Sequence, residues 1–225
     1  MNVAILIPCK DLDRGKSRLS ACLNSRSRRA LCEFFLCRTL DVATRTVPPA
    51  WVRVVTSDCR VHAIAREYGV AVIDDRAGDS HRTRDLPTRD LHAGPDPHGT
   101  LDLNAALDRG RHALVETGAC AGLVLPIDLP LATAADLGAI AAASQDVVIV
   151  PDEARDGTNV LRLGPRALPA FRFSFGPRSY AAHCTHAEAA GLEVRTVTTP
   201  GLAFDVDSPE QYRRWVRENP AWSPL

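Results

Sequence analysis

Short apolar runs alternate with longer amphipathic stretches along the chain, and this alternation constrains the fold more than any other feature. The runs are rich in Val, Ile and Leu, as expected for strands that are buried on both faces of a sheet. Strands alternating with helices predict an α/β fold with a mostly parallel sheet flanked by helices. The expected strands are 3–7, 52–56, 70–73, 122–126, 147–150, 159–163 and 193–197, and the expected helices are 27–43, 60–68, 101–115, 134–143, 178–190 and 208–218.

The length of 225 residues fits one domain, which we expect to span residues 1–225. The periodic pattern is lost around residues 75–100, where Pro, His, Arg and Asp are frequent. A stretch of this length without periodicity is typical of a flexible insertion within a domain. We therefore expect a single α/β domain that carries one insertion.

Composition narrows the class of protein. Lys and Arg together number 27, as do Asp and Glu, so the formal net charge is zero. This balance argues against a nucleic-acid or membrane-surface partner, because such proteins carry a basic excess. The seven cysteines are odd in number and contain no Cys-x-x-Cys pair, which favours reduced thiols and a cytoplasmic protein. The apolar N-terminus lacks the basic region of a signal peptide. The sequence does not determine the oligomeric state, so a homodimer is left open.

The stretch Val124–Pro130 places one carboxylate, Asp128, after an apolar run and between two prolines. Ligands of open α/β sheets bind at the carboxyl ends of the strands, where this carboxylate is expected to lie. A carboxylate at that edge suits Mg²⁺, which prefers oxygen ligands and usually shares them with substrate phosphates. Asp128 is therefore the first candidate site residue.

A basic loop follows the first expected strand. Lys10, Arg14, Lys16 and Arg18 are clustered around Gly15, at the edge where phosphates bind, although a solvated charged turn would look the same. The segment Gly15-Lys16-Ser17 matches the end of a Walker A motif. However, that motif needs a glycine at the position of Lys10, so we reject a P-loop.

Asp205 and Asp207 form a second acidic group near the C-terminus. If this segment is an extended strand, residues two apart point to the same side. The like charges of such a pair become favourable when a divalent cation binds. The alternative is that Asp207 helps to cap the last helix and Asp205 faces water. With Asp128 at a neighbouring strand end, a site for one or two Mg²⁺ ions is the better account.

Two further groups of polar residues are weaker signals. Thr158 follows a glycine, and Gly176, Arg178 and Ser179 lead into a helix N-terminus, which favours anions; ordinary turns are the alternative. Thr56, Asp58 and Asn104 are placed where polar groups could read a nucleobase edge, although the residues alone favour ordinary turn and helix chemistry. His183 and His186 are expected to be exposed on a surface helix rather than to bind metal.

The ordered set of these motifs resembles the CofC/FbiD guanylyltransferases. The resemblance begins with Ile7-Pro8-Cys9-Lys10 and Gly15-Lys16-Ser17-Arg18-Leu19. It continues through the segments 54–58, 103–107, 125–130, 157–159, 175–179 and 200–207, and so spans almost the whole chain. Each motif is weak, but their order is fairly specific. Ile127 and Cys9 depart from the family pattern, and the segment 74–100 is longer than usual.

The resemblance implies a Rossmann-like nucleotidyltransferase fold and transfer of GMP from GTP to a phosphorylated three-carbon acid, with release of pyrophosphate, in coenzyme F420 biosynthesis. It implies that Asp128, Asp205 and Asp207 hold Mg²⁺. By the same resemblance, the GTP phosphates would contact Lys10, Lys16 and Arg18; the guanosine would lie near Thr56, Asp58 and Asn104; and the acceptor would lie near Thr158, Gly176, Arg178 and Ser179.

The acceptor remains open among 2-phospho-L-lactate, phosphoenolpyruvate and 3-phospho-D-glycerate. The polar insertion around residues 75–100 favours 3-phospho-D-glycerate, the more hydroxylated acid. Two other functions are kept as alternatives. One is a nucleotidyltransferase for a sugar phosphate or another nucleotide, and the other is a GTP-binding module without turnover.

Overall fold

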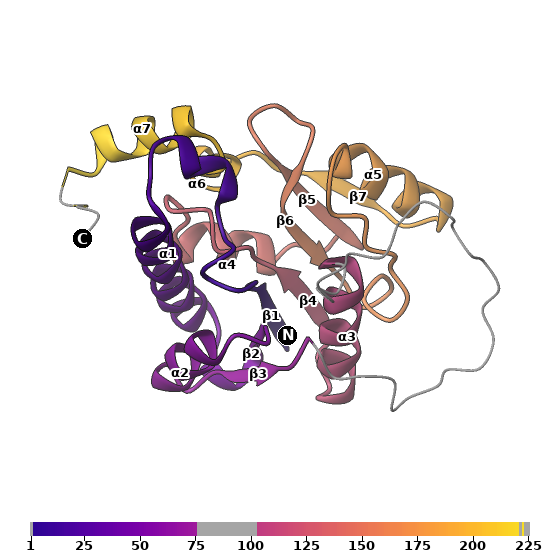
Figure 1. Ribbon diagram of the computed structural model, residues 1–225. Coiled ribbons are helices and arrows are strands. Elements are labelled where there is room, and N and C mark those ends of the chain that lie inside the picture. Colours follow the sequence, from indigo (N-terminus) through magenta and orange to yellow (C-terminus); the bar gives the residue numbers. More distant parts are fainter. Residues whose placement is uncertain (1, 76–102, 221, 223–225) are drawn as a thin grey trace, which may run out of the picture.

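The computed structural model describes residues 2–75, 103–220 and 222, and these residues form three layers (Figure 1). The central layer is a seven-stranded sheet with the order β3-β2-β1-β4-β6-β5-β7. The strands are β1 (Val3–Pro8), β2 (Val52–Val55), β3 (Ala71–Ile73), β4 (Ala121–Val124), β5 (Val147–Pro151), β6 (Thr158–Leu163) and β7 (Val194–Thr196). All seven expected strands are therefore present. The insertion expected around residues 75–100 falls outside the described residues, apart from its first residue.

The sheet is mostly parallel, as predicted, and one strand is reversed. β6 runs antiparallel to both of its neighbours, β4 and β5, whereas the other pairs are parallel. The register pairs Val124 with Leu161, so the first residue of β6 lies towards the carboxyl end of β4. The reversal therefore brings Thr158 to the edge where β1 and β4 end.

Helices cover both faces of the sheet (Figure 1). Period-two alternation in β1 sends Ile5 and Ile7 to one core and Ala4 and Leu6 to the other. The first core is closed by α1 (Ser25–Thr46), α2 (Cys59–Glu67), α4 (Ala134–Ala141) and the short α6 (Pro200–Ala203). The second core is closed by α3 (Leu103–Glu116), α5 (Ser179–Ala189) and the segment 167–173.

A third, smaller core joins the two ends of the chain. It packs Leu19 of the 3-10 helix η1 (Ser17–Ala21) and Phe35 of α1 against Trp215 of α7 (Pro209–Glu218). The Phe35 and Trp215 rings meet edge to face, with centroids 5.1 Å apart. Ser208 caps α7, with Pro209 in the first turn, as the sequence predicts. A second 3-10 helix, η2 (Pro49–Trp51), precedes β2.

One expected element is wrong. The segment 202–207 was expected to be an extended strand, but Pro200–Ala203 forms α6, and residues 204–207 lie outside the sheet. The Thr199 side chain accepts the N–H of Leu202 and Pro200 opens the first turn, so the local signals favour a helix.

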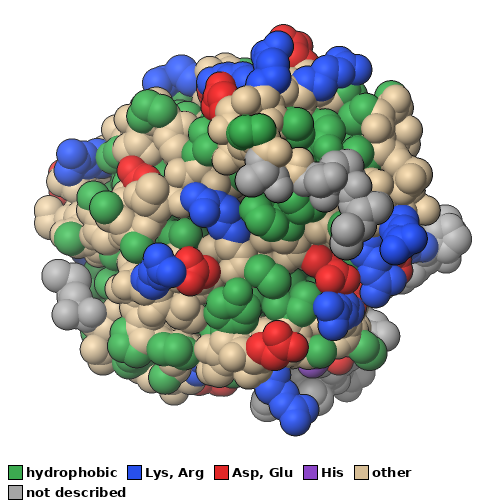
Figure 2. Space-filling model, turned by 90° about the vertical axis from the view of Figure 1, so that its left-hand side faces the viewer, with side chains coloured by type: hydrophobic (Ala, Val, Ile, Leu, Met, Phe, Trp, Pro, Cys, Tyr) green, Lys and Arg blue, Asp and Glu red, His purple; other side chains and the backbone are tan. Residues whose placement is uncertain are grey.

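The surface on the side of α1 and α7 carries interspersed acidic and basic side chains (Figure 2). Within the described part of the chain, none of the helices combines the length and apolarity needed to cross a membrane.

Candidate active site

The basic loop between β1 and η1 is held by backbone contacts at its start. The Cys9 N–H donates to the carbonyl of Val55, at 3.0 Å, and the Leu12 N–H donates to the Asp58 carboxylate, at 2.9 Å. Lys16, at the end of the loop, has a φ of 52°. A left-handed backbone is unfavourable for a lysine, and such residues gather at functional sites. These contacts therefore fix the position of the loop backbone that carries the cationic side chains.

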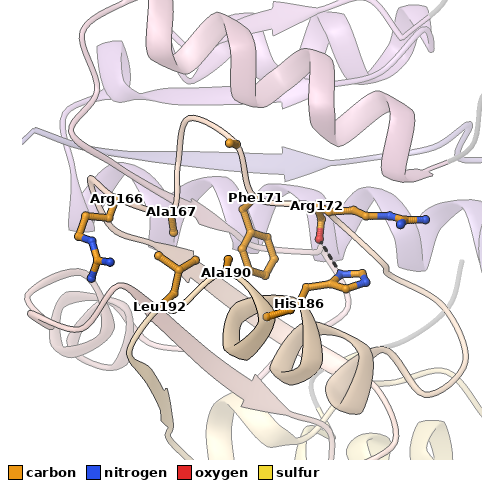
Figure 3. Close-up of a pocket in the computed structure, with 9 residues that line it drawn as sticks. Arg166, Ala167, Phe171, Arg172, His186, Ala190 and Leu192 are labelled. Carbon is orange, nitrogen blue, oxygen red and sulfur yellow. Dashed lines mark hydrogen bonds between the residues drawn. The ribbon is translucent and has the colours of Figure 1, made fainter. Parts of the chain in front are cut away.

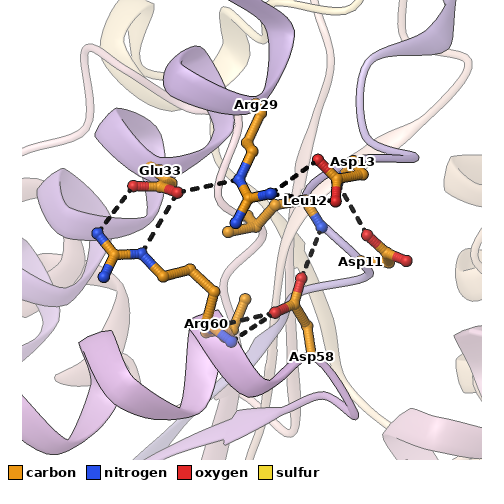
Figure 4. Close-up of polar contacts among 8 residues, drawn as sticks. Asp11, Leu12, Asp13, Arg29, Glu33, Asp58 and Arg60 are labelled. Carbon is orange, nitrogen blue, oxygen red and sulfur yellow. Dashed lines mark hydrogen bonds and ion pairs between the residues drawn. The ribbon is translucent and has the colours of Figure 1, made fainter. Parts of the chain in front are cut away.

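Asp58 accepts hydrogen bonds from the backbone of both the basic loop and helix α2. One carboxylate oxygen accepts the Leu12 N–H, and the other accepts the N–H of Arg60, at 2.7 Å, as the cap of α2 (Figure 4). The buried Thr56 hydroxyl accepts the Asp58 N–H, at 3.1 Å. Thr56 and Asp58, which were expected near guanosine, do not line either of the site cavities described below. Their observed contacts position the basic loop.

An ion-pair chain reinforces the outer side of this loop (Figure 4). Arg29 contacts Asp13 of the loop, at 3.2 Å, and Glu33, at 3.3 Å, and Arg60 reaches the same Glu33, at 3.1 Å. These pairs are largely exposed, so each contributes little to stability. Together they connect the loop, α1 and α2.

Gly15 is required by packing. A Cβ built at Gly15 would lie 2.7 Å from the Sγ atom of Cys32, which is buried in α1. Real Cβ atoms do not approach this closely, so a side chain at this position would displace either the loop or the cysteine. The glycine thus lets the loop lie directly on α1.

Lys16 joins the basic loop to the carboxylates. Its Nζ atom lies 2.7 Å from Asp128 and 2.5 Å from Asp207, and only 8% of its side chain is exposed. Burial opposes the charge on Lys16, but the two carboxylates more than offset this effect and raise its pKa. Arg18 approaches Asp207 at 3.7 Å from the solvent side. Lys16 therefore occupies the position where a cation would bridge these two carboxylates.

The acidic residues are placed by two turns. Asp128 lies in the turn after β4, and its carbonyl accepts the N–H of Val206, at 3.1 Å, which holds the 204–207 segment against that turn. Gln211 of α7 accepts the Asp207 N–H, at 3.0 Å, and donates to Asp205, at 3.2 Å. Although Asp205 and Asp207 are not on a strand, the structure brings them beside Asp128.

The carboxylates repel one another at this site. Burial and then the charges of Asp128 and Asp207 raise the pKa of Asp205 to about 6. Asp207 shows the opposite effect, because the ammonium of Lys16 outweighs burial and lowers its pKa. The pKa of Asp205 is thus raised first by burial, whereas the pKa of Asp207 is lowered by its cationic partners Lys16 and Arg18.

Thr158 and Ser179 lie on the opposite wall. The Thr158 N–H donates to the Ser179 hydroxyl, at 2.9 Å, and both residues are buried. Gly176 lies beside them with a φ of 137°, which favours glycine. Arg178 is exposed and does not line the cavity, and its N–H donates to Asp156, at 3.2 Å. The structure thus brings three of the four expected acceptor residues to this wall.

Asn104 supports the same wall from behind. Its side chain donates to the carbonyl of Phe175, at 3.1 Å, and accepts the N–H of Phe175, at 2.7 Å. This pair of bonds fixes the segment that carries Gly176. Asn104 itself does not line the cavities described below.

Two adjoining cavities open at this edge of the sheet. The smaller, about 160 Å³, is lined by the basic loop, including Lys10 and Lys16. The larger, about 350 Å³, is lined by Arg18, Thr158, Gly176, Ser179 and five aspartates: Asp128, Asp152, Asp156, Asp205 and Asp207. Pro8 and Asp207 line both. The arrangement suits two anionic ligands that meet beside the carboxylates.

A third cavity, about 390 Å³, lies between the segment after β6 and α5 (Figure 3). Arg166, Phe171, Arg172 and His186 line it, and His186 shares a hydrogen bond with the carbonyl of Arg172, at 3.2 Å. It contains none of the predicted site residues and no carboxylate, so we place the active site at the sheet edge instead.

Sequence reasoning missed His183. It was expected to be exposed, but it is fully buried against the site wall. Ser179, His183 and Ala187 are spaced four residues apart and form the buried stripe of α5. That spacing was the available signal, but two of the three residues are polar.

Comparisons with known proteins identify the family of this chain. The sequence model of the family described as "Guanylyl transferase CofC like" matches residues 98–215. A phosphoenolpyruvate guanylyltransferase from Rubrobacter xylanophilus is 38% identical over 95% of this chain and 93% of its own length. A protein of the same name from Chloroflexus aggregans is 34% identical over 97% of this chain and 100% of its own length.

Solved structures show the same fold at low sequence identity. A CMP:2-keto-3-deoxy-manno-octonic acid synthetase complexed with CTP aligns with a TM-score of 0.56 and 16% identity, covering 98% of this chain and 99% of that chain. A cytidylyltransferase from Leptospira borgpetersenii aligns with a TM-score of 0.55 and 12% identity, covering 98% and 96%. The fold is thus the single-domain α/β nucleotidyltransferase fold, and the chain belongs to the family of CofC-like guanylyltransferases.

Proposed function

We propose that this guanylyltransferase transfers GMP from GTP to phosphoenolpyruvate and releases pyrophosphate, in coenzyme F420 biosynthesis. The observation that carries the proposal is the pair of adjoining cavities, one lined by the basic loop and the other by Thr158, Gly176 and Ser179. Both cavities meet at Asp207, so a donor and an acceptor would have their phosphates side by side there. The names of the relatives support phosphoenolpyruvate as the acceptor.

The expectation of 3-phospho-D-glycerate receives no support. It depended on the polar insertion around residues 75–100, which lies outside the described residues apart from its first. 2-Phospho-L-lactate and 3-phospho-D-glycerate are retained as acceptors to be tested against phosphoenolpyruvate.

The cationic residues would hold the phosphates of GTP. Lys10 and Lys16 line the smaller cavity, and Arg18 lines the larger one beside Asp207. Lysine acts towards phosphate as a point charge, and arginine contacts it through paired N–H groups. In this role Lys16 would turn from its two carboxylates towards the phosphates when GTP enters.

Mg²⁺ fits the residues at the site. Among the described residues no three His, Cys, Asp or Glu side chains are grouped to hold a metal as they stand. Lys16 lies between Asp128 and Asp207. Mg²⁺ commonly needs only one or two carboxylates, with substrate phosphates and waters completing its shell. Burial and the neighbouring carboxylates raise the pKa of Asp205, and a bound cation would oppose that rise. Asp128, Asp205 and Asp207 would hold the ion, which would neutralise phosphate charge when bound.

The reaction needs positioning and charge more than proton transfer. A phosphate oxygen of the acceptor attacks the α-phosphorus of GTP, the bond to the β-phosphate breaks, and pyrophosphate leaves with the electron pair. The attacking phosphate is already an anion at neutral pH, so a general base is not required. The barrier is the repulsion between two anions, and cations with fixed geometry lower it.

A substrate panel tests the proposal. GTP, CTP, ATP and UTP are each supplied with the three acids and Mg²⁺, and pyrophosphate is measured. We expect turnover with GTP and phosphoenolpyruvate. A preference for CTP or for a sugar phosphate would favour the first alternative function, and GTP binding without pyrophosphate release from any acid would favour the second.

Substitution of Asp128 tests the site itself. Because the carboxylate would act on the phosphates through the cation, Asp128→Asn should lower kcat roughly 100-fold or more with the fold retained. Asp41→Asn, at an exposed position on α1 whose carboxylate pairs with Arg45, is the matched control and should leave turnover unchanged. Turnover of Asp128→Asn at the wild-type rate would refute the assignment.

A further inference from the structure

His183 is a buried titratable residue that the proposed reaction does not use. It lies in α5 with 0% exposure, packed against the rings of Phe171 and Phe175 at centroid distances of 5.9 and 4.8 Å. A buried polar ring of this kind persists when both of its nitrogens are hydrogen-bonded.

The contacts of the ring determine its tautomer. The Ser174 N–H donates to Nε2 of His183, at 3.0 Å, so Nε2 carries a lone pair and the ring is neutral. Its one hydrogen is therefore on Nδ1. Burial and, secondarily, His186 lower the pKa of His183 to about 4, in agreement with a neutral ring.

This tautomer fixes the direction of the next hydrogen bond. Nδ1 of His183 lies 2.9 Å from Oγ1 of Thr158, and it must donate because it carries the hydrogen. The Thr158 hydroxyl is therefore an acceptor towards His183, and its own hydrogen is left to point elsewhere.

The hydroxyl hydrogen of Thr158 is available to the cavity. Thr158 lines the cavity of about 350 Å³, together with Ser179. The Ser179 hydroxyl likewise accepts a bond, from the Thr158 N–H, and keeps its hydrogen. The wall thus presents two hydroxyl groups that each accept one bond from the protein and keep their own hydrogen, and Asp152 and Asp156 line the same cavity. Such a pair favours an oxyanion over a neutral ligand.

We propose that His183 is a positioning residue that holds the Thr158 hydroxyl as a hydrogen-bond donor to an oxyanion of the acceptor acid. This inference rests on the proposed function, because it needs an anionic acceptor in the larger cavity. His183 does not touch the acceptor, and its effect is transmitted through Thr158 alone. The acceptor KM should therefore respond to His183, and the GTP KM should not.

Two amide variants separate the two nitrogens of the ring. His183→Asn places an N–H donor near the position of Nδ1 and keeps the bond to Thr158. His183→Gln places its amide near Nε2, accepts the Ser174 N–H and loses the donor to Thr158. We expect His183→Gln to raise the acceptor KM about 10- to 100-fold, the size of a hydrogen bond to a charged group. His183→Asn should stay within about threefold of the wild type, and the GTP KM should stay within about twofold in both.

A double-mutant cycle tests the link to Thr158. Thr158→Val should raise the acceptor KM as much as His183→Gln does, and the double variant should be no worse than Thr158→Val alone, because both substitutions remove one interaction. His186→Gln, on the same helix but at the third cavity, is the matched control and should leave the acceptor KM unchanged. Circular dichroism and thermal unfolding check that each variant is folded.

Several outcomes would overturn the inference while the wild type remains active: an unchanged acceptor KM in His183→Gln, a parallel rise in the GTP KM, or additive effects in the cycle. If the His183 variants do not fold, Thr158→Val decides, and a wild-type acceptor KM in that variant overturns the inference. Absence of pyrophosphate release by the wild type with all three acids would instead refute the proposed function.

Discussion

At the scale of single residues, Lys16 is the buried charge that links the basic loop to the carboxylates. Its ammonium is almost fully buried and contacts two carboxylates, while its backbone has a left-handed φ of 52°. A residue that is held in an unfavourable backbone conformation by its surroundings is a mark of function. The same contacts that keep Lys16 charged also hold Asp128 and Asp207 together.

Lys16 and Mg²⁺ should therefore compete for the same carboxylates. In metal-free buffer, Lys16→Met should lower the free energy of unfolding by about 1–2 kcal/mol, a value reduced by the exposure of Asp207. Added Mg²⁺ should raise the Tm of Lys16→Met more than that of the wild type, because the ion then meets no competing ammonium. Thermal unfolding across a Mg²⁺ titration measures this difference.

Lys10→Met is the matched control, because it removes an exposed charge from the same loop. Its Mg²⁺-dependent rise in Tm should equal that of the wild type. Equal rises in all three proteins would show that the ion does not bind where Lys16 lies.

At the scale of elements, the position of the basic loop depends on how closely it approaches α1. The loop has no regular hydrogen-bonded structure of its own, and it is held by Asp58 of the β2–α2 turn and by contact with Cys32. Gly15 makes that contact possible. A change at this one point should therefore move the cationic side chains as a group.

Gly15→Ala should lower the free energy of unfolding by about 1–3 kcal/mol through overpacking and should raise the GTP KM. The variant Cys32→Ala removes the Sγ atom that the new methyl group would meet, so the double variant should recover part of the stability. Urea unfolding of the four proteins measures this coupling. Strictly additive losses would contradict the packing explanation.

At the scale of the whole molecule, the C-terminal segment completes a site that the N-terminal half begins. Helix α7 packs on η1 and α1 through Trp215, and its Gln211 holds Asp205 and Asp207. The stability of the third core and the placement of the carboxylates are thereby linked.

Trp215→Ala should cost about 3–5 kcal/mol of unfolding free energy, because a large side chain with 2% exposure is removed from a packed aromatic cluster. Phe34→Ala, which removes a ring that is 39% exposed beside the same cluster, should cost clearly less. Chemical denaturation with tryptophan fluorescence compares them, and a larger loss in Phe34→Ala would contradict the account.

Much of this architecture is readable from the sequence, since buried strands and amphipathic helices leave periodic patterns. The direction of β6 has a signal in the sequence that the apolar pattern does not carry: only eight residues separate the expected strands 147–150 and 159–163, too few for a parallel crossover, so neighbouring strands must form a hairpin. The apolar residues before Asp205 suggest a strand, but Thr199 as N-cap and Pro200 in the first turn are helix signals, and the chain forms a helix there. The burial of His183 was not predicted, because polar residues along one face of a helix normally indicate a face that is exposed to solvent.

The reversed strand β6 divides the sheet into two parts that supply different walls of the site. The parallel half, β3-β2-β1-β4, supplies the basic loop and Asp128, and the β5–β6 hairpin supplies Thr158 from the start of a strand. A hairpin tip tolerates changes in length and sequence without disturbing the strands beside it. At this tip, however, Asp152 accepts the N–H of Gly157 and Asp156 accepts the N–H of Arg178, so a change in the length of the segment 152–157 should displace Thr158 and leave the four parallel strands in place.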